Sequence, residues 1–377
     1  MRVIVLGAGP AGLYCAYLIK RQRPDADVDV FEQNPQGATF GFGVVFSDRA
    51  LEFLGADDPE TLAAILPHLE AWKGITLSHR SELLTIDGVG FTAIGRLKLL
   101  LILQERLRSV GVVPRFNYVV GSVQDLGEAD LVVGADGSNS LVRRSFESDF
   151  GASVTLLSNH FSWYGTRRRF ETLTQTFRKS ELGYFNAHHY RFSPDMSTFI
   201  VEVDADTFRR AGLDRMSEDG ARQACERVFA EELAGEPLVS NRSVWRQFPN
   251  VRNRRWSHGR YVLVGDAQRT AHFSIGSGTR LAMEDAIALA KALREYGHEI
   301  PAALVAYEQA RRPIVEKLVQ AADASAAWYA RFPEHMELEN IDFAMSYITR
   351  SGRVDREKLR QISPKFVAAY EQAHSTE

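Results

Sequence analysis

Short apolar runs that end at a glycine, followed by a helical pattern, mark the first part of the chain. Arg2–Leu6 predicts a short buried strand, Leu13–Arg21 has the apolar spacing of a helix, and Val28–Phe31 predicts a second strand. Two similar runs, Asp130–Gly134 and Arg260–Val264, predict further strands. Strands that alternate with helices indicate a parallel sheet, so the pattern predicts an α/β fold with a Rossmann-like domain.

The middle and the end of the chain show two other patterns. Residues 155–203 are rich in Trp, Phe and Tyr and are typical of strands, whereas Ala302–Ala326 is strongly periodic and predicts a helix. We therefore expect a mainly antiparallel β-sheet substrate domain inserted into the Rossmann-like domain, and C-terminal helices after both. The expected division is 1–75, 95–150 and 251–300 for the Rossmann-like domain, 76–94 and 151–250 for the substrate domain, and 301–377 for the helical region, with His374–Glu377 frayed.

Composition narrows the class of protein. The 377 residues carry 45 Lys and Arg against 48 Asp and Glu, a balance that argues against a nucleic-acid partner. No stretch reaches the roughly 18 apolar residues of a membrane span. Two cysteines, Cys15 and Cys225, lie far apart and favour a reducing cytoplasm. No spacing of His and Cys predicts a metal site. The sequence leaves open whether the protein is a monomer or a homodimer.

The loop after the first strand has the pattern of a dinucleotide-binding turn. It reads Gly7-Ala8-Gly9-Pro10-Ala11-Gly12. Glu32 follows Gly12 by 20 residues, at the end of the second strand. The glycines permit a tight turn and bring backbone N–H groups close to a pyrophosphate at a helix N-terminus, and the acid is placed for a ribose diol. Between a strand and a helix this spacing is a strong signal.

Three other elements fit an elongated cofactor. The strand at 130–134 runs into Asp136-Gly137, and the strand at 260–264 runs into Gly265-Asp266. Acids at the carboxyl ends of parallel strands lie where such sheets bind ligands. The step from Arg96 to Gln104 is eight residues, just over two helical turns, so both side chains can face one ligand.

These elements, in this order, resemble the FAD-dependent aromatic hydroxylases, the superfamily of p-hydroxybenzoate hydroxylase. The resemblance implies FAD as cofactor, with Asp266 at its ribityl chain, Asp136 near its pyrophosphate, and Arg96 and Gln104 in contact with it. Because the chain has a single dinucleotide fingerprint, NADH or NADPH is expected to visit transiently as electron donor. The family uses O₂ as co-substrate through a C4a-hydroperoxyflavin, whose electrophilic distal oxygen is attacked by a ring carbon that a hydroxyl or amino group has made electron-rich.

A narrower resemblance rests on one run near residue 275. The run is His272-Phe273-Ser274-Ile275-Gly276-Ser277-Gly278-Thr279. It is similar to salicylyl-CoA 5-hydroxylases and to the hydroxylase halves of 2-aminobenzoyl-CoA monooxygenases, and more distantly to a hydroxylase of tryptophan derivatives. Thr39–Asp48, Trp163–Thr166 and Met196–Glu202 carry the same likeness, although Phe42 replaces an expected Trp and Arg280 an expected Lys. Gly276, Gly278 and Thr279 are expected beside the flavin ring.

His272 is the catalytic candidate, since it precedes the flavin-facing run and a neutral imidazole can accept a phenol proton. A purely structural role is the alternative. The candidates for the substrate pocket are Phe42, Val45, Trp163, His188, Tyr190 and Phe273. For each of them a place in the core is the alternative. The arginine clusters at 167–169 and 252–255 suit the phosphates of CoA, or are solvated loops.

The predicted function is therefore that of a single-component flavoprotein monooxygenase. The expected reaction is 5-hydroxylation of salicylyl-CoA (2-hydroxybenzoyl-CoA) or of a related 2-amino- or 2-hydroxybenzoyl thioester. One alternative is a hydroxylase of a tryptophan-derived or other free aromatic compound. A second alternative, of another class, is an FAD-binding redox or regulatory module without catalysis.

Overall fold

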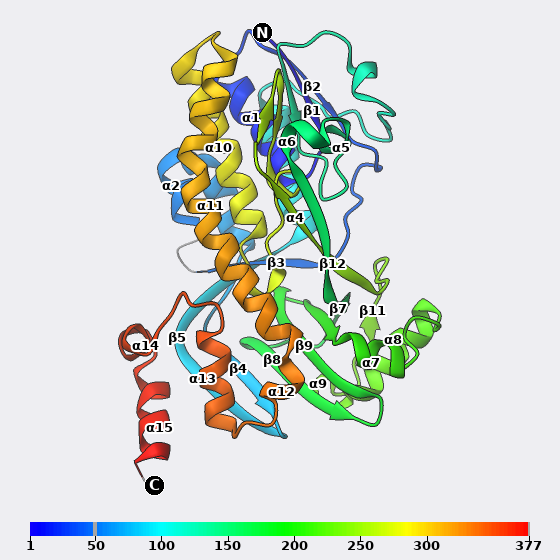
Figure 1. The fold of residues 1–377 in the computed structure, drawn as a ribbon, viewed down its shortest axis with the longest axis vertical. Coiled ribbons are helices and arrows are strands. Elements are labelled where there is room, and N and C mark those ends of the chain that lie inside the picture. Colours follow the sequence, from blue (N-terminus) through cyan, green and yellow to red (C-terminus); the bar gives the residue numbers. More distant parts are fainter. Residues whose placement is uncertain (48–50, 376–377) are drawn as a thin grey trace.

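The computed structural model describes residues 1–47 and 51–375. Asp48 of the Thr39–Asp48 stretch, and residues 376–377 of the end predicted to fray, lie outside the described residues. The chain forms an upper lobe that holds the N-terminus and a lower lobe that holds the C-terminus (Figure 1). One long helix, α11 (Ile300–Ala330), runs from one lobe to the other.

The sheet of the upper lobe has the order β13-β14-β6-β1-β2. Its strands are β1 (Arg2–Leu6), β2 (Asp27–Phe31), β6 (Leu131–Gly134), β13 (Ser257–His258) and β14 (Tyr261–Leu263). Strands β2, β1, β6 and β14 run parallel, and β13 pairs antiparallel with β14 at the edge. The Rossmann-like α/β domain predicted from the apolar runs is confirmed, because each predicted strand lies within a residue or two of an observed one.

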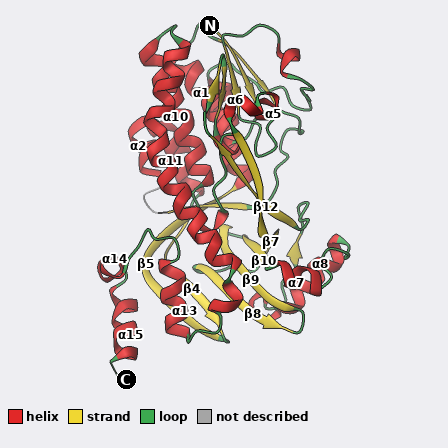
Figure 2. Cartoon of the chain, viewed as in Figure 1, coloured by secondary structure: helices red, strands yellow, loops and turns green. Residues whose placement is uncertain are grey.

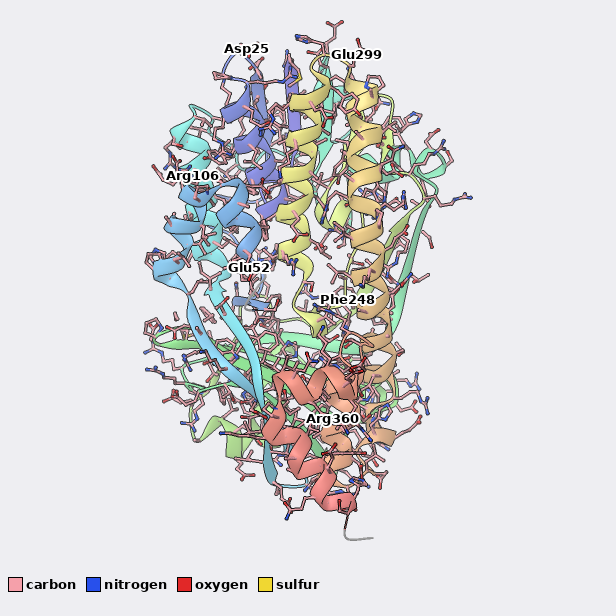
Figure 3. The ribbon with its side chains drawn as sticks, turned by 90° about the vertical axis from the view of Figure 1, so that its left-hand side faces the viewer. Asp25, Glu52, Arg106, Phe248, Glu299 and Arg360 are labelled. Carbon is pink, nitrogen blue, oxygen red and sulfur yellow. The ribbon has the colours of Figure 1, made fainter. Side chains whose placement is uncertain are left out.

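Helices cover the face of this sheet with apolar side chains. Helix α1 (Pro10–Gln22) packs between α4 (Arg96–Ser109) and α10 (Gly278–Tyr296), and α10 packs in turn on α11. The long helices α10 and α11 stand side by side in Figure 3. Every residue of α1 from Ala11 to Ile19 is buried, which explains why its amphipathic pattern is weak.

The lower lobe is built on a nine-stranded sheet in the order β11-β7-β10-β9-β8-β4-β5-β3, with β12 also paired to β7. The strands are β3 (Gly43–Ser47), β4 (Glu70–His79), β5 (Glu82–Gly95), β7 (Ala152–Thr166), β8 (Leu173–Ser180), β9 (Gly183–Ser193), β10 (Met196–Val203), β11 (Leu238–Val239) and β12 (Arg246–Asn253). All pairs are antiparallel except β4 with β8. Because β3 and the start of β4 precede residue 76, this sheet draws on both predicted domains, and the predicted division stays a prediction.

The C-terminal helices pack on the lower sheet instead of forming a separate unit. They are α12 (Phe332–His335), α13 (Asn340–Thr349), α14 (Arg356–Ile362) and α15 (Pro364–His374). Phe343 and Tyr347 of α13 join Phe177 of β8 and Trp328 of α11 in one buried aromatic cluster. Asp87 of β5 receives the backbone N–H of Phe366 at 2.9 Å, which fixes the start of α15. Helices α13 and α14 both lie against β5 of the lower sheet (Figure 2).

The remaining helices are short. They are α2 (Glu52–Asp57), α3 (Pro59–Ile65), α5 (Leu141–Ser145), α6 (Glu147–Phe150), α7 (Ala205–Arg210), α8 (Glu218–Val228) and α9 (Ala230–Leu233). Within residues 1–47 and 51–375, none of the helices combines the length and the apolar character that a bilayer crossing requires. Cys15 and Cys225 are both buried and free.

Candidate active site

A cavity of about 440 Å³ lies between the two lobes. Its upper wall comes from the turn before α1 and from the start of α10, and its lower wall comes from β3, β5, β8 and β9. The walls are largely apolar, and a few polar groups, among them Arg96 and Asp266, project into it. Such a concave, mostly apolar site with few polar groups is typical of a cofactor or small-molecule pocket.

The glycines of the predicted dinucleotide turn have two different roles. Gly7 has a φ of +97°, and a Cβ at Gly12 would lie 1.9 Å from the carbonyl oxygen of Gly7, so these two glycines permit the backbone to fold on itself. A Cβ at Gly9, by contrast, would meet nothing within 4 Å. Gly9, Pro10 and Ala11 line the cavity at the N-terminus of α1. The open side of Gly9 is therefore the place where a phosphate can approach the helix.

Glu32 lies beside this turn at the end of β2. Its Oε2 accepts the backbone N–H of Ala8 at 2.8 Å, and its Oε1 accepts two N–H groups of Asn34. The carboxylate is thus held next to the glycine turn, and Oε2, which accepts a single hydrogen bond, keeps a second lone pair. This is the placement that a ribose diol requires.

Arg96 and Asp266 face each other across the cavity wall. Burial lowers the pKa of Arg96, and the nearby Asp266 works against that shift. Asp266 lines the cavity, and its exposed surface faces the cavity. Burial by the surrounding protein raises the pKa of its carboxyl, and the charges of Arg269 and Arg96 act against that shift. The pair provides a cation and an anion for an elongated polar ligand.

Asp136 and Gln104 stand behind the cavity rather than in its wall. Asp136 Oδ2 accepts the backbone N–H groups of Leu141 and Val142, so it caps α5 and holds the loop whose neighbours Ala135 and Gly137 line the cavity. Gln104 is buried on α4, the helix that begins at Arg96. Their direct contact with a cofactor, inferred from the sequence, stays a prediction.

The run at 272–279 connects the cavity to α10. Gly276 has a φ of +60° and a Cβ there would lie 2.9 Å from Val45, so only glycine fits this turn. A Cβ at Gly278 would meet nothing within 4 Å, and Gly278 opens α10 toward the cavity. Gly276, Gly278 and Thr279 all line the cavity, and the positive end of the helix favours an anionic ligand there.

His272 lies behind this run and not in the cavity wall. Its Nδ1 is 2.8 Å from Ser274 Oγ, and Ser274 does line the cavity. Burial, with smaller contributions from His188 and Arg350, lowers the pKa of His272 to about 3. The imidazole is therefore neutral near pH 7, and it reaches the cavity through one hydroxyl.

Five of the six substrate-pocket candidates line the cavity: Val45, Trp163, His188, Tyr190 and Phe273. Phe42 is the exception, because its ring packs over Gly165, where a Cβ would lie 2.5 Å from it. Tyr190 donates to the carbonyl of Gly43 at 3.0 Å, and burial lowers the pKa of His188 to about 3. Whether these residues touch a substrate stays a prediction.

The sequence patterns missed a third group of lining residues. Tyr347, Arg350, Arg353 and Lys358 reach the cavity from α13, α14 and the turn between them. Arg350 lies 4.0 Å above the Tyr347 ring and donates to the carbonyl of Ser274 at 2.9 Å. Helical periodicity alone does not tell which sheet a helix covers. The cluster of Arg350, Arg353 and Lys358 around the turn at Ser351-Gly352 is the feature of the sequence that could have indicated a ligand-binding role.

The site fits a dinucleotide. Arg96 Nε, Gln104 Oε1 and Asp136 Oδ1 are buried and have no hydrogen-bond partner among the described residues. Buried polar atoms are normally paired, because each unpaired one costs about 1–3 kcal/mol. A ligand that lies along the glycine turn, past Asp266 and on to Gly278 passes Arg96, the one of these three residues that lines the cavity. Fold and site together define a dinucleotide-binding protein.

Comparison with known proteins agrees and is more specific. A sequence family described as FAD binding domain matches residues 108–322, and one described as NAD(P)-binding Rossmann-like domain matches residues 5–40. A salicyloyl-CoA 5-hydroxylase from Streptomyces sp is 44% identical over 93% of this chain and 70% of that protein. A 3-hydroxy-4-methyl-anthranilyl-[aryl-carrier protein] 5-monooxygenase from Streptosporangium sibiricum is 37% identical over 94% of this chain and 95% of its own length.

The chain belongs to the FAD-dependent monooxygenases of the p-hydroxybenzoate hydroxylase family. Among solved structures, 2-methyl-3-hydroxypyridine-5-carboxylic acid oxygenase has the same fold, with a TM-score of 0.70 at 20% identity over 95% of both chains. The protein is an enzyme that hydroxylates an aromatic ring with FAD, with a nicotinamide nucleotide as electron donor and O₂ as co-substrate. The resemblance drawn from four spaced motifs is confirmed, and the alternative of a non-catalytic module is wrong.

Proposed function

We propose that the chain hydroxylates carbon 5 of salicylyl-CoA or of a closely related 2-amino- or 2-hydroxybenzoyl thioester. The two relatives carry the proposal, since both names describe oxygenation at position 5 of an ortho-substituted benzoyl group held on a carrier. A hydroxyl or amino group makes the ring carbon para to it electron-rich, and in such substrates that carbon is carbon 5. The same attack therefore suits both substrates.

The cavity supports an aromatic thioester. Val45, Phe91 and Phe273 offer an apolar surface for a ring, and His188 supplies a neutral polar group beside it. Arg350, Arg353 and Lys358 also line the cavity and make part of its wall cationic. Arg353 forms no ion pair with a described carboxylate. Burial lowers the pKa of its guanidinium, and the charge of Arg280 lowers it further. An uncompensated cation of this kind suits the anionic carrier of a thioester better than a neutral free compound.

The residues toward FAD have separate tasks in this proposal. Gly9, Pro10 and Ala11 at the start of α1 hold the pyrophosphate, and Glu32 holds the adenosine ribose. Arg96 and Asp266 bind the central part of the cofactor, and the start of α10 at Gly278 lies beside the ring system. Bound FAD supplies the activation of O₂, and the chain supplies orientation, exclusion of water and removal of the substrate proton. We place the enzyme in the cytoplasm, where its two buried cysteines stay reduced.

A substrate screen tests the proposal. The purified holoenzyme receives NADH or NADPH together with 2-hydroxybenzoyl-CoA, 2-aminobenzoyl-CoA or the matching free acids. We expect rapid NAD(P)H oxidation with both thioesters and a product heavier by one oxygen atom, and little stimulation by the free acids. Product from the free acids alone, or NAD(P)H oxidation without hydroxylated product from any thioester, would contradict the thioester assignment.

A further inference from the structure

A second cavity, of about 330 Å³, lies against the active site. It is bounded by β7, β10, β12 and α11, and it shares Phe248 with the main cavity, at the junction of the lobes (Figure 3). His272 lines the second cavity, while Phe273 and Ser274, the next two residues, line the first. At its far end lies Asp323, whose side chain is 50% exposed, so the second cavity reaches the surface.

Glu202 gives this cavity an unusual wall. Its side chain is 1% exposed, its Oε1 accepts Asn159 Nδ2 at 2.7 Å, and its Oε2 has no hydrogen-bond partner among the described residues. Burial raises the pKa of Glu202 to about 7, against the lowering effect of Asn159. Within the described part of the chain Glu202 forms no ion pair. A buried carboxyl without a cation is costly to keep, and one that titrates near neutrality can take up and release a proton.

A chain of hydrogen bonds joins the two cavities. Arg350 Nε, which can only donate, is 3.0 Å from Ser325 Oγ. Ser325 Oγ is 2.8 Å from Ser274 Oγ, which is 2.8 Å from His272 Nδ1. In one arrangement Ser325 donates to Ser274 and Ser274 donates to His272 Nδ1, which leaves the imidazole proton on Nε2. In the other, His272 Nδ1 donates to Ser274, and Ser325 accepts from both Ser274 and Arg350. Outward proton transfer uses the first arrangement.

We propose that the second cavity is a proton outlet of the hydroxylation site, in which Ser274 and His272 pass on the proton of the substrate's ring hydroxyl and Glu202 receives it on the way to solvent. The inference rests on the proposed function, because it needs a substrate with an acidic ring substituent in the main cavity.

The transfer is balanced without any co-reactant. The O–H bond of the substrate breaks, its electron pair stays on the ring oxygen, and the proton bonds to Ser274 Oγ. The original hydroxyl proton of Ser274 moves to His272 Nδ1, and the Nε2 proton of His272 leaves into the second cavity. The volume of the cavity accommodates water, which Asn159, Asn250 and Glu202 in its lining can hold by hydrogen bonds and which carries the proton to the Glu202 carboxylate. Glu202 then releases it toward solvent, and a ring oxygen that holds the negative charge activates the ring for attack.

The charged groups around the route favour movement outward. Burial, followed by His188 and Arg350 on the active-site side, lowers the pKa of His272, so His272 does not retain the proton. On the outer side stand the two carboxyls, Glu202 and Asp323, and Arg252 pairs with Asp323 at 2.6 Å. Tyr329 also faces this region, but burial raises its pKa well above the ordinary value, so it stays protonated.

Proton release on substrate binding tests the outlet directly. Holoenzyme without NAD(P)H is mixed with 2-hydroxybenzoyl-CoA in weak buffer with a pH indicator, and flavin absorbance reports binding separately. We expect Glu202→Gln to slow proton release about tenfold or more, because a positioned acid–base group contributes at least that factor. Substrate affinity is expected to change less than about twofold, since Glu202 lies outside the main cavity. His272→Asn should have the same effect, and the double variant should be no slower than the slower single variant.

Glu232→Gln is the matched control. Glu232 also has a raised pKa from burial and an unpartnered Oε2, but it lines neither cavity. Its variant should release the proton at the parent rate. Should Glu202→Gln fail to retain FAD, Asn159→Leu replaces it: loss of the hydrogen bond raises the pKa of Glu202 further and moves the pH profile of proton release upward. Unchanged release rates in the Glu202 and His272 variants would overturn the outlet.

A measurement without substrate separates this inference from the proposed function. The infrared band of a protonated carboxyl should disappear as the pH rises through about 7 in the parent and in Glu232→Gln, and be missing in Glu202→Gln. If flavin absorbance shows no binding of the thioester, the proposed function fails. The infrared band of Glu202 then still tests the proton outlet. Absence of the band in the parent at pH 6 would overturn the outlet whatever the substrate.

Discussion

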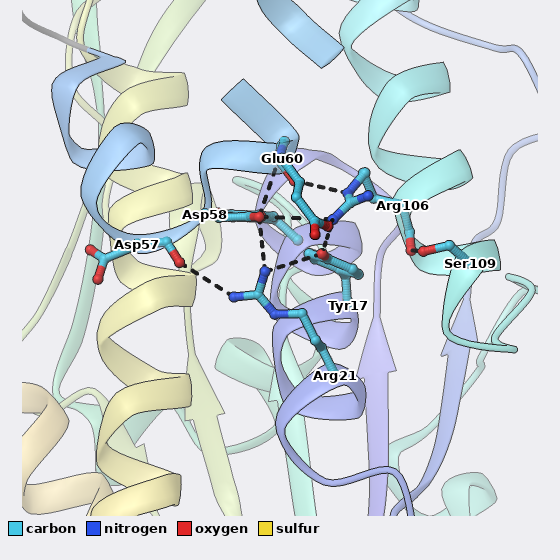
Figure 4. A network of polar contacts seen from close by, with 9 residues as sticks. Tyr17, Arg21, Asp57, Asp58, Glu60, Arg106 and Ser109 are labelled. Carbon is cyan, nitrogen blue, oxygen red and sulfur yellow. Dashed lines mark hydrogen bonds and ion pairs between the residues drawn. The ribbon is translucent and has the colours of Figure 1, made fainter. Parts of the chain in front are cut away.

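Two buried polar clusters of the upper lobe look alike in composition and differ in how they are completed. Around Asp58, which is fully buried, the protein itself provides every partner (Figure 4). Arg21 donates to Oδ1 at 2.8 Å, and Tyr14 donates to Oδ2 at 3.1 Å. Around Arg96, by contrast, polar atoms of Arg96, Gln104 and Asp136 are buried without partners among the described residues.

The difference separates structure from function better than residue type does. The Asp58 cluster ties α1 to α3 and α4, since Arg106 of α4 also contacts Tyr17 and Glu60 (Figure 4). Its polar groups need nothing more, so it contributes to stability alone. The cluster around Arg96 is incomplete among the described residues, and we expect bound FAD to complete it. The predictions below test this distinction.

A pair of glycine variants should give the largest contrast. Gly12→Ala puts a Cβ 1.9 Å from a backbone oxygen, so this variant should not fold. Gly9→Ala adds the same methyl group where nothing lies within 4 Å, so the apoprotein should unfold at the parent's urea midpoint. FAD affinity should nevertheless fall, because the methyl group occupies the approach to the helix end. Parent-like FAD affinity in Gly9→Ala would mean that the pyrophosphate lies elsewhere.

Asp58→Ala should give the next largest effect, a loss in the free energy of unfolding. It leaves Arg21 and Arg106 without their buried partner and removes the cap of α3, so we expect about 3 kcal/mol loss in the free energy of unfolding. Urea unfolding of apoprotein measures this loss. The FAD dissociation constant of the folded variant should stay within about twofold of the parent, and a larger change would break the comparison.

Arg96→Met should have the opposite signature. Replacing a buried cation whose Nε lacks a partner should leave the apoprotein as stable or more stable. Loss of a charged hydrogen bond to the cofactor should weaken FAD binding by about 2 kcal/mol, near thirtyfold. Fluorescence titration of apoprotein with FAD reports the affinity, and equal losses of stability and affinity would assign Arg96 to the structural kind of cluster.

A pH effect at Glu202 should be the smallest. Its folded pKa is about 7 against an ordinary 4.5, so the folded state holds a proton that the unfolded state has lost in this window. Stability from this group is present below pH 4.5 and is lost as the pH rises toward 7. Between pH 5 and 6 the parent should lose about 1 kcal/mol relative to Glu202→Gln. A difference that is flat with pH would show that Glu202 is ionised in the folded protein.

The sequence predicted the upper half of the site from local geometry and the lower half mainly from resemblance, for a physical reason. The glycine turn, Glu32, Arg96 and Asp266 are each fixed by local geometry: a turn, a strand end or a helix start. Local geometry is encoded in short spacings, so these residues could be identified before their neighbours were known. Their arrangement along one wall then follows from parallel strands ending at a common edge.

The lower half depends on contacts between distant segments. Arg350 reaches the cavity because α13 packs on β8. No motif in the 310–350 region predicts that packing. Phe42 was expected in the pocket from its neighbours in sequence, but the open face of Gly165 receives its ring instead. His272 was identified from its place before the flavin-facing run. Its second cavity, and Glu202 within it, became visible only in the folded chain.

A single turnover under oxygen-18 gas tests the central claim most directly. The holoenzyme is reduced with one equivalent of NAD(P)H in the presence of 2-hydroxybenzoyl-CoA and then exposed to the labelled gas, and the thioester is analysed by mass spectrometry and by NMR. The account predicts one labelled oxygen atom per thioester, bonded to carbon 5 of the ring. Hydrogen peroxide with unchanged thioester, in a protein that has bound both FAD and the thioester, would contradict it.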